Sequence, residues 1–389
     1  MEVITETRVP LYIFANSSSI EPDCLRQAKD IANLEPAFHH VALMPDAHVG
    51  YGMPIGGILA LKGHICPNAV GVDIGCGMVF TPTNLTAREI AKKDLEKLVQ
   101  QIMRDIPTGF NIHKKPKTAP PFLQNPKLPS VLEKEIDRAL KSLGTLGGGN
   151  HFIDIQKDQE GKIALMIHSG SRHFGLSIAK YYHQKAREIC QKKNIDLPTP
   201  DLAYLESDST LGQEYIRAMN LAMQYAKENR RQLMEATKKA VKEIFPQAKF
   251  GQELNAHHNY AALETHFGEK VWVHRKGAIR AGEKDPVIVP GSMTTHSYVG
   301  VGLGNPDSFN SCAHGAGRKL GRREAKRRYR VEEILKDIEE QGVILGKIKK
   351  GDIAEESRFS YKNIEEVIEN QKDLAKMEIQ LTPLASIIG

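Results

Sequence analysis

Glycine is concentrated in five short clusters, and these clusters restrict the fold more than any other feature of the chain. They lie at residues 50–57, 71–77, 144–149, 291–304 and 315–321. Glycine lets the backbone adopt positive φ and lets a ligand approach the main chain closely. Because several clusters follow short β-rich runs, we expect them to form turns at strand ends that present polar side chains.

Two hydrophobic periodicities predict the elements between these turns. Amphipathic spacing predicts helices over residues 87–105, 130–143, 176–193, 211–244, 319–340 and 364–377. Short runs rich in β-branched residues predict strands at 41–44, 58–61, 152–155, 163–167, 271–274 and 287–289. The sequence therefore predicts an α/β fold, with a mixed β core covered by helices.

The net charge of the chain is +6, which permits a nucleic-acid partner without requiring one. Solubility alone also explains such a charge. Residues 112–129 are expected to form a surface loop, because Lys114, Lys115 and Lys117 alternate there with prolines.

Five cysteines stand far apart, at positions 24, 66, 76, 190 and 312. An odd, dispersed set argues against a disulfide framework. No apolar run is long enough to span a bilayer, and the N-terminus lacks the pattern of a signal peptide. We expect a reduced, cytoplasmic protein with no membrane partner, in which a functional cysteine would be a ligand or a nucleophile.

Asp73 and Cys76 lie three residues apart in the glycine-rich segment GVDIGCGM. Both side chains can point at one centre, and a carboxylate with a thiolate suits a divalent transition ion. A thiolate can also bridge two ions. The alternative is a buried structural cysteine beside an ordinary turn aspartate.

Three histidine-containing segments could supply further metal ligands. They are LGGGNHF at residues 146–152, IHSGSR at 167–172 and HHNY at 257–260. Adjacent residues on a helix or strand face different ways, so we expect only one of His257 and His258 to be a ligand. The guanidinium of Arg172 fits a pair of phosphate oxygens. For His151 or His168 taken alone, a structural role is the more common one.

A further histidine, His314, heads the segment HGAGR and precedes a predicted basic helix. A helix N-terminus attracts phosphate, so His314 could meet an activated phosphate there, although a simple capping turn is the alternative. The small residues of 289–297 suit contacts to a nucleoside or phosphate, or form an ordinary loop. Asp46 and His48 could support the site electrostatically or transfer a proton, or simply start a turn.

One carboxylate, one thiolate and three histidines make five candidate ligands. Five are few for two separate ions but adequate for a pair that shares a bridging ligand. Such paired ions are the usual clamp for phosphoryl displacement.

In this order, the motifs closely resemble the RtcB family of RNA-splicing ligases. The resemblance runs from about residue 44 to 323 and rests on GVDIGCGM, LGGGNHF, IHSGSR, HHNY, PGSM and SCAHGAGR. It implies a single domain over residues 1–389. It also implies an enzyme that joins an RNA 3′-phosphate or 2′,3′-cyclic phosphate to a 5′-hydroxyl, using GTP and two Mn²⁺ ions.

The resemblance also implies roles for individual residues. His314 would be the catalytic nucleophile that becomes covalently guanylylated. The metal ligands would be Asp73, Cys76, His151, His168 and His258, with Cys76 shared by both ions. The guanylate contacts would be Asn150, Asn259, Pro290, Gly291, Ser292, Met293, Ser297, His314, Gly315, Ala316 and Gly317. Arg172 and Arg322 would hold an RNA phosphate.

One departure concerns the C-terminus, where the family pattern ends in Lys-Gly and this chain has Ile388-Gly389. An apolar side chain supplies neither charge nor a hydrogen bond to a bound guanylate. Two rival functions therefore stay open: a binuclear metal phosphatase or phosphodiesterase acting on RNA ends, and a non-catalytic RNA-binding relative. The RNA substrate, the oligomeric state and the need for an activating protein are also open.

Overall fold

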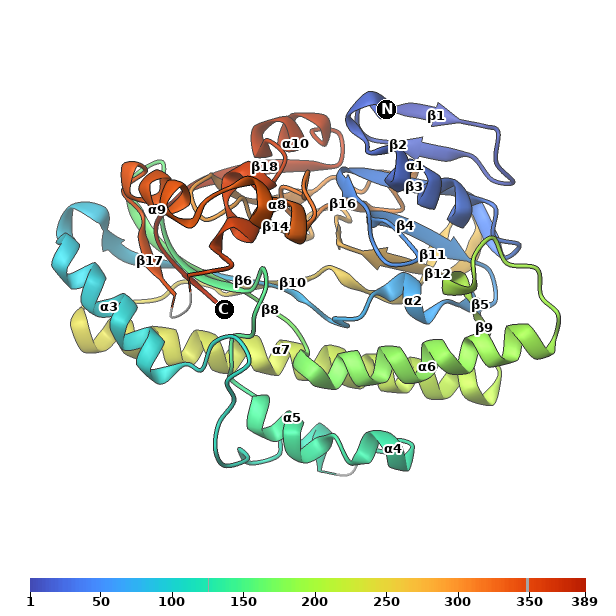
Figure 1. Cartoon of the computed structure of the whole chain (residues 1–389), viewed down its shortest axis with the longest axis horizontal. Helices are drawn as coiled ribbons and strands as arrows, with labels where there is room; N and C mark the ends of the chain where they lie inside the picture. Colours follow the sequence, from blue (N-terminus) through green and yellow to red (C-terminus); the bar gives the residue numbers. More distant parts are fainter. Residues whose placement is uncertain (125, 348–349) are drawn as a thin grey trace.

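Two large β-sheets form the centre of the molecule (Figure 1). The computed structural model describes residues 1–124, 126–347 and 350–389. The first sheet has the strand order β1-β2-β3-β4-β12-β11, and the second has the order β10-β6-β8-β7-β18-β15-β14, with β17 also paired to β18. These sheets and the helices around them confirm the predicted α/β fold.

The strands of the first sheet are β1 (Glu2–Ile4), β2 (Leu11–Ile13), β3 (Ala37–His48), β4 (Ile55–Leu61), β12 (Glu269–Lys276) and β11 (Asn259–His266). Those of the second are β10 (Leu254–His257), β6 (Gly77–Thr86), β8 (Lys162–Ser169), β7 (Phe152–Asp158), β18 (Ala375–Ile388), β15 (Ser297–Gly302), β14 (Pro286–Val289) and β17 (Ile344–Gly346). Two small ladders pair β13 (Ala278–Arg280) with β16 (Ser311–Ala313), and β5 (His64–Ile65) with β9 (Leu205–Glu206). All six predicted strand runs lie inside observed strands.

Alternating side chains of β8 build two different cores. Ala164 and Met166 join a cluster to which both sheets contribute, whereas Leu165 and Ile167 face the helices on the outer side. Successive side chains of a strand point to opposite faces, so a strand buried on both faces is apolar at almost every position. This explains why the run at 163–167 shows no polar alternation.

The helices cover both outer faces of the paired sheets. They are α1 (Pro22–Ala32), α2 (Pro67–Val70), α3 (Lys92–Asp105), α4 (Ser130–Glu133), α5 (Ile136–Ser142), α6 (Arg172–Lys192), α7 (Thr210–Ile244), α8 (Arg322–Arg328), α9 (Val331–Glu340) and α10 (Ile364–Asn370). Helix α1 packs on the first sheet, and α3 and α7 pack on the second. Figure 1 shows α6 and α7 running along one side of the molecule, with α4 and α5 beyond them.

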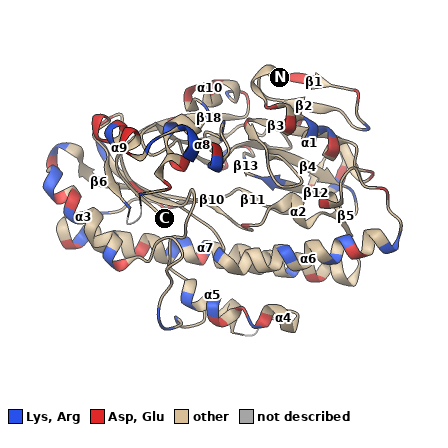
Figure 2. Cartoon of the chain, in the orientation of Figure 1, with Lys and Arg blue, Asp and Glu red and all other residues tan. Residues whose placement is uncertain are grey.

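Charged side chains lie mainly on these helices and on the loops, while the sheets between them are largely uncharged (Figure 2). Within the three described stretches of chain, no helix combines the length and the apolar composition needed to cross a membrane.

Four predicted helices were wrong in extent. The helix expected at 130–143 is the two helices α4 and α5, and the helix expected at 87–105 begins as α3 only at Lys92. The helix expected at 364–377 ends at Asn370, and the chain then enters strand β18. The missed signal is the strict alternation of Met377, Ile379 and Leu381 with charged or polar residues, which is the period of a strand. The helix expected at 319–340 is two helices, separated at residues 329–330, where the backbone of Arg330 is extended.

We predict that Leu165→Ala destabilises the protein by about 2–5 kcal/mol, because it leaves a cavity between the second sheet and its helices. Leu165 on β8 is fully buried, whereas Leu263 on β11 is 54% exposed. The matched control Leu263→Ala should change stability by no more than about 0.5 kcal/mol. Urea denaturation followed by circular dichroism measures both, and equal effects of the two variants would contradict the assigned core.

Candidate metal and nucleotide site

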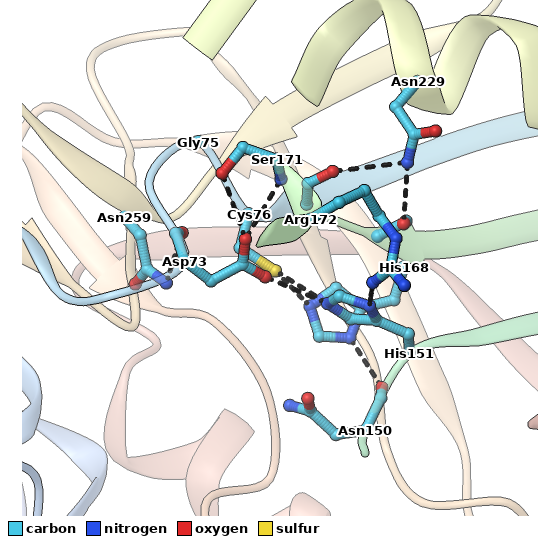
Figure 3. A network of polar contacts seen from close by, with 12 residues as sticks. Asp73, Gly75, Cys76, Asn150, His151, His168, Ser171, Arg172, Asn229 and Asn259 are labelled. Atoms are coloured by element: carbon cyan, nitrogen blue, oxygen red, sulfur yellow. Dashed lines mark hydrogen bonds and ion pairs between the residues drawn. The ribbon is translucent and has the colours of Figure 1, made fainter. Parts of the chain in front are cut away.

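The five predicted metal ligands come from turns and strand ends of the second sheet. Asp73 and Cys76 lie in the turn before β6, His151 directly precedes β7, His168 lies near the end of β8, and His258 links β10 to β11. Because β10, β6, β8 and β7 are consecutive neighbours, these positions meet at one place, where Figure 3 shows Asp73, Cys76, His151 and His168. The structure therefore brings together residues that are up to 185 positions apart, from 73 to 258.

The ligand atoms are within coordination distance of common centres. Cys76 Sγ lies 3.2 Å from His168 Nε2 and 3.4 Å from His151 Nε2. His168 Nε2 lies 3.3 Å from His258 Nε2, and His151 Nε2 lies 3.1 Å from Asp73 Oδ2. Two candidate groups result, Cys76–His168–His258 and Asp73–Cys76–His151, and Cys76 belongs to both.

Backbone carbonyls orient two of the imidazoles. His151 Nδ1 lies 3.0 Å from the carbonyl oxygen of Leu146, and His168 Nδ1 lies 2.8 Å from that of Asn150. A carbonyl can only accept, so each Nδ1 carries a proton, and Nε2 is the atom that each ring directs at the cluster. Metal-binding histidines are held in this way.

Burial favours the neutral imidazoles that a metal site needs, but it opposes the ionised forms of Asp73 and Cys76. Burial, followed by the neighbouring charges of other histidines, holds the pKa of His168 and that of His258 well below the ordinary value. Burial alone would raise the pKa of Asp73, but its contact with His151 holds that pKa at about 2. Burial raises the pKa of the Cys76 thiol well above its usual value, so its thiolate depends on a nearby cation.

His314 lies beside this cluster, and a buried carboxylate holds it. Its Nδ1 lies 2.7 Å from Asp46 Oδ2, which also accepts the backbone N–H of His314 at 3.1 Å. Asp46 is fully buried on β3, and the His314 ring centre lies 4.8 Å from that of His258. Nδ1–H donates to Asp46, which leaves Nε2 as the free nitrogen.

The turn after His314 needs a glycine at position 317, because the backbone there lies close to the backbone of Asp46. Gly317 has φ +71°, and a Cβ there would lie 2.0 Å from the carbonyl oxygen of Asp46. The expected helix N-terminus is not at this position, because α8 starts only at Arg322 and has seven residues. Asp46 is therefore the group that orients His314, and His48 lies behind it with Nδ1 3.0 Å from the Asp46 carbonyl oxygen.

A cavity of about 570 Å³ connects His314 to the metal cluster. Most predicted nucleotide contacts line it, namely Asn150, Asn259, Pro290, Gly291, Ser292, Met293, His314, Gly315, Ala316 and Gly317. Ser297 does not line the cavity. Its hydroxyl accepts the backbone N–H of Gly291 at 3.2 Å, so Ser297 supports the lining loop from behind.

The side-chain amide of Asn259 already has backbone partners. It donates to the carbonyl of Asp73 at 3.1 Å and accepts the N–H of Gly277 at 2.8 Å. Asn259 therefore fixes the turn that carries Asp73, in addition to lining the cavity.

Ile388 also lines the cavity, and it is only 3% exposed. It packs in an apolar cluster with Met293 and pairs with Phe152 across β18 and β7. Where the family pattern has a lysine, this chain therefore presents the apolar side chain of Ile388. The buried carboxyl of Asp154 lines the same cavity, and one of its oxygens lacks a hydrogen-bond partner in the described chain.

The two arginines expected at RNA phosphates lie at different depths. Arg172 Nε lies 3.3 Å from Thr145 Oγ1, and its Nη2 donates to the carbonyl of Gly109 at 3.3 Å. Arg322 lines the cavity, and its side chain is 49% exposed. Arg322 is therefore accessible to an incoming phosphate. Arg172 instead donates hydrogen bonds to Thr145 and Gly109, which lie in two different loops.

One supporting residue, Arg230 on α7, was not predicted from the sequence. Arg230 is fully buried and donates to the carbonyls of Gly75 and Ser169 at 2.9 and 2.8 Å, and its Nη2 lies 2.9 Å from His257 Nδ1. These contacts tie His257 away from the cluster and leave His258 to face it. A polar residue on the buried face of an amphipathic helix is the only sequence signal, and it does not name the partner.

Comparisons with known proteins identify the family of the chain. A family model described as tRNA-splicing ligase RtcB matches residues 27–122 and 120–389. The chain belongs to the RtcB family. The RNA-splicing ligase RtcB of Escherichia coli K12 is 35% identical to the chain over 410 aligned positions, covering 100% of this chain and 99% of the relative.

Archaeal members of the RtcB family match over nearly the same length. The tRNA-splicing ligase RtcB of Pyrobaculum aerophilum is 32% identical and that of Thermococcus kodakarensis is 29% identical. Each alignment covers 98% of this chain and 95% of the relative. The similarity therefore includes all the segments that build the cluster and the cavity.

We predict that Cys76→Ala abolishes binding of both ions, because Cys76 is the ligand common to the two groups, whereas His151→Ala removes a ligand from only one. Equilibrium dialysis against Mn²⁺ followed by elemental analysis measures the number of bound ions. The matched control is Cys190→Ala, another buried cysteine, which lies on α6 and belongs to neither group. Two ions retained by folded Cys76→Ala would contradict the shared ligand.

Proposed function

We propose that this chain is an RNA ligase that joins a 3′-phosphate or 2′,3′-cyclic phosphate end to a 5′-hydroxyl end, using GTP and two Mn²⁺ ions. The observation that carries the proposal is the Asp46–His314 pair, which lines one cavity together with the cluster around Cys76. Membership of the RtcB family and relatives named as RNA-splicing ligases support it.

The first step is nucleophilic attack by His314 on the α-phosphate of GTP. A bond forms between Nε2 and the phosphorus, the bond to the bridging oxygen breaks, and pyrophosphate leaves. The imidazole becomes positively charged as the bond forms, and the buried carboxylate of Asp46 at 2.7 Å stabilises that charge. Asp46 also keeps the proton on Nδ1, so that Nε2 is the reactive atom.

Asp73, Cys76, His151, His168 and His258 would hold the two ions. Imidazole, thiolate and carboxylate together suit divalent transition ions, and the choice of Mn²⁺ follows from the family resemblance. Bound there, the ions would supply positive charge to phosphate oxygens that become more negative during the reaction.

The later steps transfer GMP to RNA and then seal the ends. The RNA 3′-phosphate takes GMP from His314, and the 5′-hydroxyl then attacks this activated phosphate and displaces GMP. A 2′,3′-cyclic phosphate is hydrolysed first, so that a free 3′-phosphate is available. Arg322 at the cavity wall is placed to bind a phosphate of the RNA. A cytoplasmic location and a possible activating protein partner belong to the same proposal.

A metal phosphodiesterase acting on RNA ends would use the same cluster but would not need His314. A carboxylate behind an imidazole also serves hydrolases, where the imidazole is a general base, so covalent labelling of His314 is the observation that separates the two functions.

We predict that His314→Ala abolishes covalent labelling of the protein by α-³²P-GTP in the presence of Mn²⁺, since no other nitrogen takes its place. The control His64→Ala changes a histidine whose ring lies outside the cavity and contacts the carbonyl of Lys62. This control should retain full labelling. Acid-labile label on folded His314→Ala, or none on the unaltered protein, would refute the ligase mechanism.

We also predict that Asp46→Asn slows formation of the labelled protein by about 10²- to 10⁴-fold, because the neutral amide no longer stabilises a charged imidazole. Asp46 belongs to neither metal group, so the number of bound ions should stay the same. Single-turnover labelling and metal analysis of the same sample separate the two effects. A labelling rate within roughly threefold of that of the unaltered protein would contradict the role of Asp46.

A further inference from the structure

The loop after α3 carries a fully exposed aromatic ring. Phe110 has a relative exposure of 104%, the highest among the exposed large apolar side chains of the described chain. A single exposed apolar residue needs no explanation by itself. The position of Phe110 does need an explanation, because the residues just before it are hydrogen-bonded to the candidate site.

Two backbone hydrogen bonds join this loop to the glycine turn that precedes His151. Leu146 donates its N–H to the carbonyl of Pro107 at 3.0 Å, and Gly109 donates to the carbonyl of Gly147 at 2.8 Å. The carbonyl of Gly109 in turn accepts from Arg172 Nη2 at 3.3 Å. Phe110 is therefore adjacent in sequence to a residue that is held by both Arg172 and the turn carrying a metal ligand.

The continuation of the loop is basic and held against α5. His113 donates its N–H to the carbonyl of Lys141 at 2.9 Å, and Lys117 donates to that of Leu140 at 3.1 Å. Between them, Lys114 and Lys115 are exposed, and no acidic side chain pairs with either within the described residues. At most about 14 Å of extended chain separates Phe110 from Lys114, so the ring and the two charges lie within reach of one short ligand.

We propose that Phe110 is a stacking platform for an unpaired base of the RNA, and that Lys114 and Lys115 bind phosphates of the same strand. The inference rests on the proposed function, because it assumes that RNA ends reach the cavity. Every nucleobase offers a face to an exposed aromatic ring, and the phosphates supply the opposite charge to the lysines. An aromatic ring beside unpaired cations fits a single strand better than a neutral protein surface.

The test measures binding of a fluorescent single-stranded RNA with a 3′-phosphate by anisotropy, without GTP. Phe110→Ala should raise the Kd by roughly 5- to 100-fold, which is the usual effect of losing one stacked base. Phe110→Trp should retain tight binding, while Phe110→Leu should resemble the alanine variant, because leucine is apolar but has no π-face. Leu263→Ala, an exposed apolar residue on β11, is the control and should leave the Kd unchanged.

A second experiment tests Lys114 and Lys115 through the salt dependence of the Kd for RNA. Replacing Lys114 and Lys115 by alanine should reduce the slope of log Kd against log salt concentration by about 0.7 for each lysine. The adjacent pair Lys92 and Lys93, at the opposite end of α3, is the matched control and should leave the slope unchanged.

The outcomes separate this inference from the proposed function. If the unaltered chain binds RNA and Phe110→Ala binds it equally well, the inference is overturned, and the loop is left as a surface for a protein partner. If the unaltered chain binds no RNA at all, the proposed function is overturned together with it.

Discussion

The site depends on several imidazole lone pairs being buried face to face. Nitrogen atoms of His151, His168 and His258 point toward Cys76 Sγ or toward one another at 3.2–3.4 Å, in a region that water hardly reaches. Without a cation such lone pairs repel, so the surrounding backbone must hold them in place. The carbonyl acceptors of Leu146 and Asn150 do so, and they are themselves fixed by the sheet and the glycine turn.

The imidazole rings of this site fall into two kinds. They differ in the group that accepts the hydrogen bond from Nδ1. The imidazoles of His151 and His168 donate to neutral carbonyls, which fix the ring while leaving it a neutral ligand. The imidazole of His314 donates to the charged carboxylate of Asp46, which would stabilise the positive ring that the proposed attack on GTP produces. His314 thus differs from the nearby histidines in the acceptor behind it, although its ring lies within contact distance of His258.

The sequence predicted the residues of the cluster better than the means by which they meet. The spacing of Asp73 and Cys76 is local, so their shared direction follows from the turn itself. The convergence of His151, His168 and His258 depends on the strand order, which no local pattern contains. The partnership of Asp46 with His314 spans 268 positions, and the sequence alone left three roles open for Asp46: electrostatic support, proton transfer and the start of a turn.

Strand β18 was missed as a strand, yet it lies between β7 and β15 and pairs Phe152 with Ile388. These two residues are separated by more than half of the 389 positions of the chain. During synthesis, β7 therefore has an unpaired edge beside the turn that carries His151. This edge stays unpaired until β18 has been synthesised. Such long-range pairing slows folding, and a nascent chain with an uncovered edge of this kind is exposed to aggregation until β18 has docked.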